Sequence, residues 1–210
     1  MSTRSERIAQ VLVDMSAVNF TPDAPITFKS GIKSPVYVDN RTIPYIPAAW
    51  HTVIEGFSET IKDQNLAYDV IAGIATAGIP HSAALAYTLQ KPSVFIRKEA
   101  KAHGQKKRIE GGEVSGKRVL LIEDLITTGG SSLSGVDELR NDGATVSDCM
   151  AIVSYGFSES ADAFQAADIR LHTLTTFEHI LAYARSQGKI TETMLKSVET
   201  WMQDPHTWAG

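Results

Sequence analysis

The sequence predicts an α/β protein: a central, mostly parallel sheet flanked by helices, with a small N-terminal hood of one helix and short strands. Two observations lead to this prediction. From residue 47 onward, apolar runs of strand composition alternate with stretches of helical periodicity, as in βαβ units. Before residue 47, recurrent prolines prevent long elements. A chain of 210 residues with 43% hydrophobic content can bury one sizeable core, so we expect one domain over residues 1–210.

The N-terminal hood is predicted over residues 1–47. Residues 4–18 carry apolar side chains at helical spacing, namely Ile8, Val11, Leu12, Met15 and Val18. Residues 26–28 and 36–38 have the composition of short strands between turns. We therefore expect a helix followed by a small strand-and-turn unit that flanks the main sheet.

The main sheet and its helices are predicted from residue 47 to residue 202. The predicted order is helix 47–64, strand 70–74, helix 79–90, strand 93–96, strand 118–123, a helix from residues 129–131 to 140, strand 146–154, strand 170–175, and helices 177–186 and 190–202. Strands that alternate with helices favour parallel pairing, because right-handed crossovers return each strand to the same direction.

Composition excludes several classes of protein. The formal net charge of −4 argues against a general nucleic-acid binder, whose affinity would come from many Lys and Arg side chains. The sequence has no apolar stretch of the roughly 18–20 residues that a membrane span needs, and residues 1–10 lack the apolar core of a secretory signal. The single cysteine, Cys149, is expected to be buried packing. We expect a cytoplasmic protein that binds neither membrane nor nucleic acid.

The segment 119–132, VLLIEDLITTGGSS, carries the strongest functional signal. Ligands of open α/β sheets bind beyond the carboxyl ends of the strands, where this run places Glu123 and Asp124. Such carboxylates can accept hydrogen bonds from neighbouring sugar hydroxyls and help to retain a divalent cation. The residues that follow supply hydroxyls, close backbone approach and the free N–H groups of a helix start, and they are Thr127, Thr128, Gly129, Gly130 and Ser131. A sugar phosphate fits this combination.

The alternative reading of segment 119–132 is a buried strand that ends in a solvated turn and a capped helix. The order of apolar strand, paired acids, Thr-Thr-Gly-Gly and small residues disfavours it. This order resembles the signature with which type I phosphoribosyltransferases bind phosphoribosyl pyrophosphate (PRPP). The resemblance implies Mg²⁺ as cofactor, Asp124 as a catalytic residue, and Glu123 and the loop 127–131 as substrate-binding residues.

A basic segment forms a second candidate site. Residues 97–108 contain six Lys or Arg and one acid, Glu99, whereas the rest of the chain is acidic. The surrounding loop, residues 97–116, is long and polar for a connection between two strands, and long loops of this kind are often lids. Its cations can neutralise a leaving pyrophosphate, although a solvated run of surface charge is the plainer interpretation.

Residues 28–37, FKSGIKSPVY, and residues 97–104, RKEAKAHG, narrow the resemblance to orotate phosphoribosyltransferases. By itself, Lys29 fits a carboxylate ligand or a solvated surface equally well. The resemblance implies that Lys29 contacts substrate and that the backbone near Val36 and Tyr37 lies against the pyrimidine ring. It implies pyrophosphate binding by Arg97, Lys98, Lys101 and His103, with Lys101 and His103 catalytic. It also implies a homodimer in which each lid serves the neighbouring subunit's site.

Two departures from the family pattern keep other functions open. Many members have a Lys before Gly78, where this chain has Ala77, and many have an Arg that meets the orotate carboxylate near the position of Tyr155. A phosphoribosyltransferase for another nucleobase therefore remains an alternative, as does a non-catalytic PRPP-binding regulator. The basic lid and the lack of a recognisable DNA-binding motif weigh against the regulator.

Overall fold

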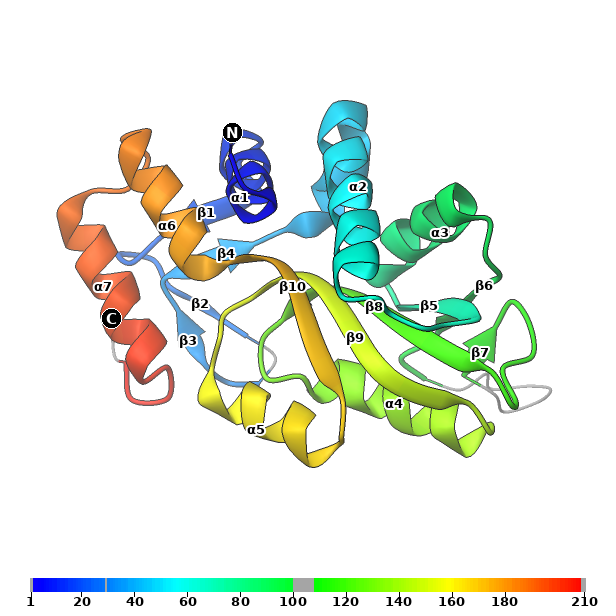
Figure 1. Cartoon of the computed structure of the whole chain (residues 1–210). Helices are drawn as coiled ribbons and strands as arrows, with labels where there is room; N and C mark the ends of the chain where they lie inside the picture. The colour runs from blue at the N-terminus through cyan, green and yellow to red at the C-terminus, as the bar shows by residue number, and fades with distance from the viewer. Residues whose placement is uncertain (1, 29, 100–107, 209–210) are drawn as a thin grey trace.

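The computed structural model describes residues 2–28, 30–99 and 108–208. Its centre is a six-stranded sheet (Figure 1). The strands lie in the spatial order β10 (Arg170–Thr176), β9 (Thr145–Ser154), β8 (Arg118–Ile126), β5 (Val70–Ile74), β6 (Ser93–Ile96) and β7 (Ile109–Glu110). All neighbours are parallel except β6 and β7, which pair antiparallel. The predicted α/β fold with a mostly parallel sheet is confirmed.

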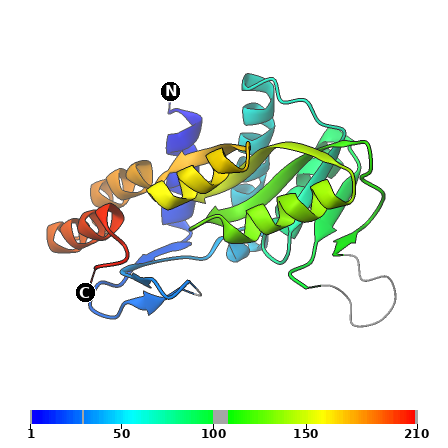
Figure 2. The ribbon, with the colours of Figure 1, turned by 90° about the horizontal axis from the view of Figure 1, so that it is seen from below.

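Helices cover both faces of this sheet, and each face has its own hydrophobic core. The helices α1 (Arg4–Asp14), α2 (Pro47–Asp63) and α3 (Gly78–Leu89) cover one face, whereas α4 (Gly130–Asn141) and α5 (Ser158–Ala166) cover the other (Figures 1 and 2). Leu120 and Ile122 of β8 belong to the first core, while Val119 and Leu121 belong to the second. Burial on both faces explains why the central strands are continuous apolar runs.

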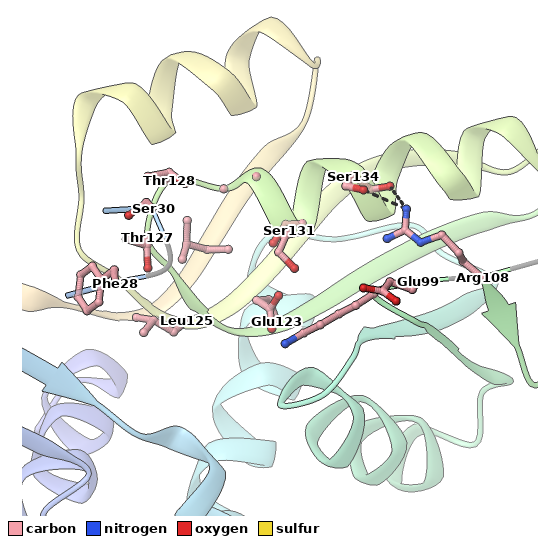
Figure 3. A pocket seen from close by; sticks show the side chains of 15 residues that line it. Phe28, Ser30, Glu99, Arg108, Glu123, Leu125, Thr127, Thr128, Ser131 and Ser134 are labelled. Atoms are coloured by element: carbon pink, nitrogen blue, oxygen red, sulfur yellow. Dashed lines mark hydrogen bonds between the residues drawn. The ribbon is translucent and has the colours of Figure 1, made fainter. Parts of the chain in front are cut away.

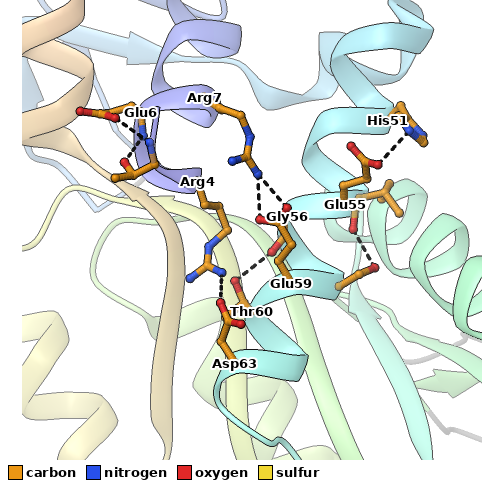
Figure 4. Close-up of polar contacts among 12 residues, drawn as sticks. Arg4, Glu6, Arg7, His51, Glu55, Gly56, Glu59, Thr60 and Asp63 are labelled. Carbon is orange, nitrogen blue, oxygen red and sulfur yellow. Dashed lines mark hydrogen bonds and ion pairs between the residues drawn. The ribbon is translucent and has the colours of Figure 1, made fainter. Parts of the chain in front are cut away.

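Ion pairs fasten α1 to α2 (Figure 4). Arg4 Nη1 lies 2.7 Å from Asp63 Oδ2, and Arg7 Nη2 lies 2.8 Å from Glu59 Oε1. Next to the Arg7–Glu59 pair the helices approach closely, because a Cβ on Gly56 would lie 3.2 Å from Ile8 Cδ1. The N-terminal helix is therefore part of the main body.

Helix α1 ends four residues before the predicted end at residue 18. Its start is fixed by a capping box, in which Glu6 N–H donates to Thr3 Oγ1 and Thr3 N–H donates to the Glu6 side chain. Ser16 has a φ of +57°, which stops the helix, and Val18 begins strand β1 (Val18–Phe20). The apolar spacing was misleading because Val18 is buried as a strand residue, paired with Val38.

The hood consists of two small antiparallel sheets and a 3₁₀ helix. Strand β1 pairs with β4 (Val36–Val38), β2 (Ile26–Thr27) pairs with β3 (Lys33–Ser34), and η1 (Asn40–Tyr45) leads into α2. Trp201 of the C-terminal helix α7 (Glu192–Gln203) donates from Nε1 to the Lys33 backbone oxygen at 2.8 Å. The preceding helix is α6 (Phe177–Ser186). Helix α7 thus holds the hood in place.

Most predicted boundaries agree with the structure within two residues, and the exceptions are the end of α1 and the end of β8. The prediction placed Glu123 and Asp124 at the end of a strand, whereas β8 continues to Ile126 and both acids lie within it. The short elements β1, β3, β7, η1 and α5 were not predicted. None of the helices among the described residues is long and apolar enough to span a membrane.

Candidate active site

A cavity of about 590 Å³ lies at the carboxyl end of β8 (Figure 3). It extends from the hood, through the loop after β8, to the first residues of the basic segment. Its lining consists of Phe28, Ser30, Lys98, Glu99, Arg108, Glu123, Leu125, Ile126, Thr127, Thr128, Gly129, Gly130, Ser131, Ser132 and Ser134. A cavity at this edge of a parallel sheet is where α/β proteins bind ligands.

The loop 127–131 has the geometry of an anion site. Gly129 adopts a φ of +84° at the N-cap of α4, a conformation that glycine tolerates best. A Cβ there would lie 2.8 Å from Phe164 Cε2, so the position also lacks space for a larger residue. Helix α4 begins at Gly130, and Gly130, Ser131 and Ser132 of its first turn line the cavity, so the free N–H groups of a helix start lie at the cavity wall. The hydroxyls of Thr127 and Ser131 lie beside the same space (Figure 3).

The two acids differ in exposure and share one environment. Glu123 is only 6% exposed, and burial together with the charge of Asp124 raises the pKa of its carboxyl well above the usual value. Burial also raises the pKa of Asp124, although the neighbouring Glu123 side chain and backbone N–H groups oppose the shift. The Asp124 N–H donates to Glu123 Oε1 at 3.1 Å. Two crowded carboxyls favour a cationic or hydroxyl-rich ligand.

Among the predicted cations, the structure brings Lys98 to the cavity and gives Arg97 another partner. Lys98 lines the cavity, and its charge favours ionised Glu123. Arg97 instead pairs with Glu110 of β7, at 3.4 Å between Nη1 and Oε1. Lys29, Lys101 and His103 lie outside the described residues.

Arg108 is a lining cation that sequence reasoning did not single out. It donates from Nε to the Arg97 backbone oxygen at 2.8 Å and from Nη1 to Ser134 Oγ at 3.0 Å. Both bonds tie the end of the basic segment to β6 and α4. Its position at the end of the basic segment 97–108 was the sequence feature that could have identified it as a site residue. Phe28, Ser30, Glu99, Ser132 and Ser134 also line the cavity without having been chosen as site residues.

The hood side of the cavity is aromatic. Phe28 lies 5.5 Å from Tyr155, centroid to centroid, and Tyr155 also packs on Phe157 and Trp201. Tyr155 is 1% exposed, so a neutral ring fills the position after β9. Val36 is fully buried, and Tyr37 is 37% exposed and accepts a bond from Arg41 Nη2 at 2.7 Å. Among the described residues, Val36, Tyr37 and Asp124 do not line this cavity.

The loop between β5 and α3 approaches the acids from the opposite side. A Cβ on Gly78 would lie 2.6 Å from the Ile122 backbone oxygen and 3.5 Å from Glu123 Oε1. Only glycine permits this contact. The loop 75–78 and the acidic pair are therefore one packed unit.

A parallel sheet with an acidic strand end, a glycine loop at a helix start and nearby cations defines a protein that binds a phosphorylated sugar or nucleotide. Comparison with known proteins specifies the class. The phosphoribosyl transferase domain family matches residues 43–197. The chain is 42% identical over 200 residues to the orotate phosphoribosyltransferase of Halalkalibacterium halodurans, covering 95% of both chains. It is 39% identical to that of Coxiella burnetii, covering 98% of both.

The fold agrees with these sequence matches. The crystal structure of orotate phosphoribosyltransferase from Aeropyrum pernix is similar with a TM-score of 0.75 and 28% identity, covering 88% of this chain and 99% of that one. The chain belongs to the phosphoribosyltransferase family, and within it to the orotate phosphoribosyltransferases.

Proposed function

We propose that the protein transfers the 5-phosphoribosyl group from PRPP to orotate in a Mg²⁺-dependent reaction, giving orotidine 5′-phosphate and pyrophosphate for pyrimidine synthesis. The observation that carries the proposal is the single cavity that joins buried Glu123, the loop 127–131 and Lys98. The 42% identity to an orotate phosphoribosyltransferase over 95% of the chain supports the choice of base.

The sugar phosphate is assigned to the β8 side of the cavity. The loop 127–131 binds the 5-phosphate through backbone N–H groups and hydroxyls, while Glu123 and Asp124 accept bonds from the ribose hydroxyls. The ring nitrogen of orotate bonds to the anomeric carbon as the bond from that carbon to pyrophosphate breaks, and the ring N–H proton is released. Because the transition state is electron-poor at that carbon, positioning and electrostatics matter more than a protein nucleophile.

The leaving pyrophosphate is assigned to the basic segment. Lys98 and Arg108 are at the cavity wall, and Arg97, Lys101 and His103 are proposed partners by family resemblance. Lys29 and the backbone near Val36 and Tyr37 are proposed to hold the base. Lys101, His103 and Asp124 are the proposed catalytic residues.

A divalent cation fits the acidic pair. Burial raises the pKa of both carboxyls because it disfavours their ionised forms. A nearby cation offsets this cost of ionisation. No group of three or more His, Cys, Asp or Glu side chains with metal-site geometry occurs in the described ranges, so we propose that Mg²⁺ binds mainly through PRPP. When bound, Mg²⁺ would stabilise charge on the leaving group.

The neutral Tyr155 favours one second candidate, a transferase for another nucleobase, because no cation stands at that position. Incubating the purified protein with Mg²⁺ and PRPP and a panel of orotate, uracil, adenine and hypoxanthine separates the two. We expect Mg²⁺-dependent loss of orotate absorbance alone. Turnover of another base without orotate turnover contradicts the proposal.

Two substitutions assign the roles within that assay. Asp124→Asn should weaken PRPP binding, because the amide is a poorer acceptor for ribose hydroxyls, while Lys101→Ala should lower turnover with PRPP binding retained. Calorimetric titration with PRPP and steady-state kinetics measure the two effects. Unchanged kinetics in either variant removes that residue from the mechanism.

We further propose a cytoplasmic homodimer whose lids are shared between subunits. Tyr45 and Tyr87 support an interface, since these large side chains are 90% and 88% exposed in the single chain. Both η1 and α3, which carry them, contact α2.

A further inference from the structure

Asn40 makes a long-range contact to the acidic pair. Its side chain is fully buried, and Nδ2 donates to the Asp124 backbone oxygen at 2.9 Å. Asn40 is the first residue of η1, where the hood leads toward the main body. The bond therefore joins the hood to the strand position that carries a proposed ribose ligand.

Asn40 keeps a polar atom at a place where an apolar atom would cost less. Within the described part of the chain, Asn40 Oδ1 is buried without a hydrogen-bond partner. Burying such an oxygen without a partner destabilises a fold. Packing alone is therefore a weak reason for an asparagine at this position. The bond from Asn40 to Asp124 is the specific interaction that the arrangement provides.

We propose that Asn40 is a positioning residue for Asp124, through a buried hydrogen bond that joins the hood to the end of β8. The bond fixes the backbone from which the Asp124 carboxylate projects. The close packing of Gly78 on Ile122 and Glu123 makes the same end of β8 rigid from the α3 side. The inference rests on the proposed binding of the PRPP ribose by Asp124.

The first test removes this hydrogen bond. In Asn40→Ala, we expect kcat/KM for PRPP to fall about 10- to 100-fold, because a small misplacement of a binding group has effects of that size. The KM for orotate should stay near the wild-type value.

The controls separate positioning from folding. Thr60→Ala removes another buried bond, from Thr60 Oγ1 to the Gly56 backbone oxygen (Figure 4), and should lower the melting temperature without changing PRPP kinetics. If Asn40→Ala does not fold, Asn40→Ser replaces it, because the shorter side chain does not bring a donor to the Asp124 backbone oxygen in the same geometry.

Direct calorimetric titration with PRPP gives the deciding result. Wild-type affinity for PRPP in folded Asn40→Ala, or in Asn40→Ser where it replaces the alanine variant, overturns the proposal. An equal loss of affinity in Thr60→Ala overturns it too. Absence of PRPP binding by the wild-type protein contradicts the proposed function instead, so the two failures are distinguishable.

Discussion

At the scale of single residues, Glu123 combines a proposed role in substrate binding with a cost in stability. Its carboxyl is buried beside Asp124, and both effects raise its pKa. A folded-state pKa above the unfolded value means that folded protein binds more protons, so stability falls as pH rises above about 4.5. Glu123→Gln should therefore raise the melting temperature at pH 7–8, by roughly 2–4 °C per kcal/mol recovered, with no gain near pH 4.

Asp69 provides the control of opposite sign. Hydrogen bonds from Arg118 hold the pKa of Asp69 below its usual range, so its contribution to stability is lost as pH falls. Asp69→Asn should lower the melting temperature at neutral pH, and the difference should vanish in acid. Thermal melts of Glu123→Gln from pH 4 to pH 8, and of Asp69→Asn from pH 8 down to about pH 2, below the ordinary carboxyl pKa of 3.8, check the signs. A Glu123→Gln variant that melts below wild type at pH 8 contradicts the assigned cost.

Single residues were predictable from sequence where order along the chain determines position. Glu123 and the loop 127–131 follow an apolar run, and a strand followed by a helix forces them to one sheet edge. The roles of Arg97 and Arg108 were not predictable in this way. Pairing of β6 with β7 brings Arg97 to Glu110 and Arg108 to Ser134, and a two-residue strand such as β7 has no recognisable pattern of its own.

At the scale of elements, the start of α4 depends on glycine for two reasons, and two substitutions separate them. Gly129→Ala meets both an unfavourable φ of +84° and Phe164 at 2.8 Å, whereas Gly188→Ala, with φ of +65°, meets no atom within 4 Å. Both should lose about 1 kcal/mol of stability from the backbone. Only Gly129→Ala should also weaken PRPP binding, measured by calorimetry. Equal PRPP affinity in the two variants contradicts the phosphate role of the loop.

Helix α7 supports the hood through Trp201. Trp201→Phe keeps the contacts with Tyr155 and Phe157 but removes the bond to the Lys33 backbone oxygen, which should cost about 1 kcal/mol and raise the KM for orotate more than that for PRPP. Trp50→Phe is the matched control, since Trp50 Nε1 is buried without a hydrogen-bond partner among the described residues. Urea melts and steady-state kinetics measure both effects. A rise in orotate KM in Trp50→Phe equal to that in Trp201→Phe refutes the specific support.

Long elements were predictable because burial determines their apolar pattern: a helix buries one face, and a central strand of a parallel sheet buries both. Helix α1 shows the limit: Val18 continues the helical spacing, yet the chain turns at Ser16 so that Val18 can pair with Val38. The short elements of the hood are stabilised by such long-range contacts. Trp201 and Lys33 are 168 residues apart, and no local pattern connects them.

At the scale of the whole molecule, the two cores and the sheet order follow from alternating strands and helices, whereas subunit arrangement depends on surfaces. The proposed shared lid makes a specific prediction. If lids are exchanged between subunits, then in a heterodimer of one Asp124→Asn subunit and one Lys101→Ala subunit the site with intact Asp124 receives the intact lid of its neighbour. Two inactive proteins should then give a heterodimer with about half the wild-type activity, because one of its two sites is complete.

The heterodimer is obtained by coexpressing the two variants with different affinity tags and purifying through both. Each homodimer serves as a control and should be inactive, since every site in it lacks either the acid or the lid lysine. If each lid served its own subunit, both sites of the heterodimer would be defective and no activity would return. An isolated heterodimer without orotate turnover therefore excludes the shared lid, and failure to recover any doubly tagged species excludes the dimer itself.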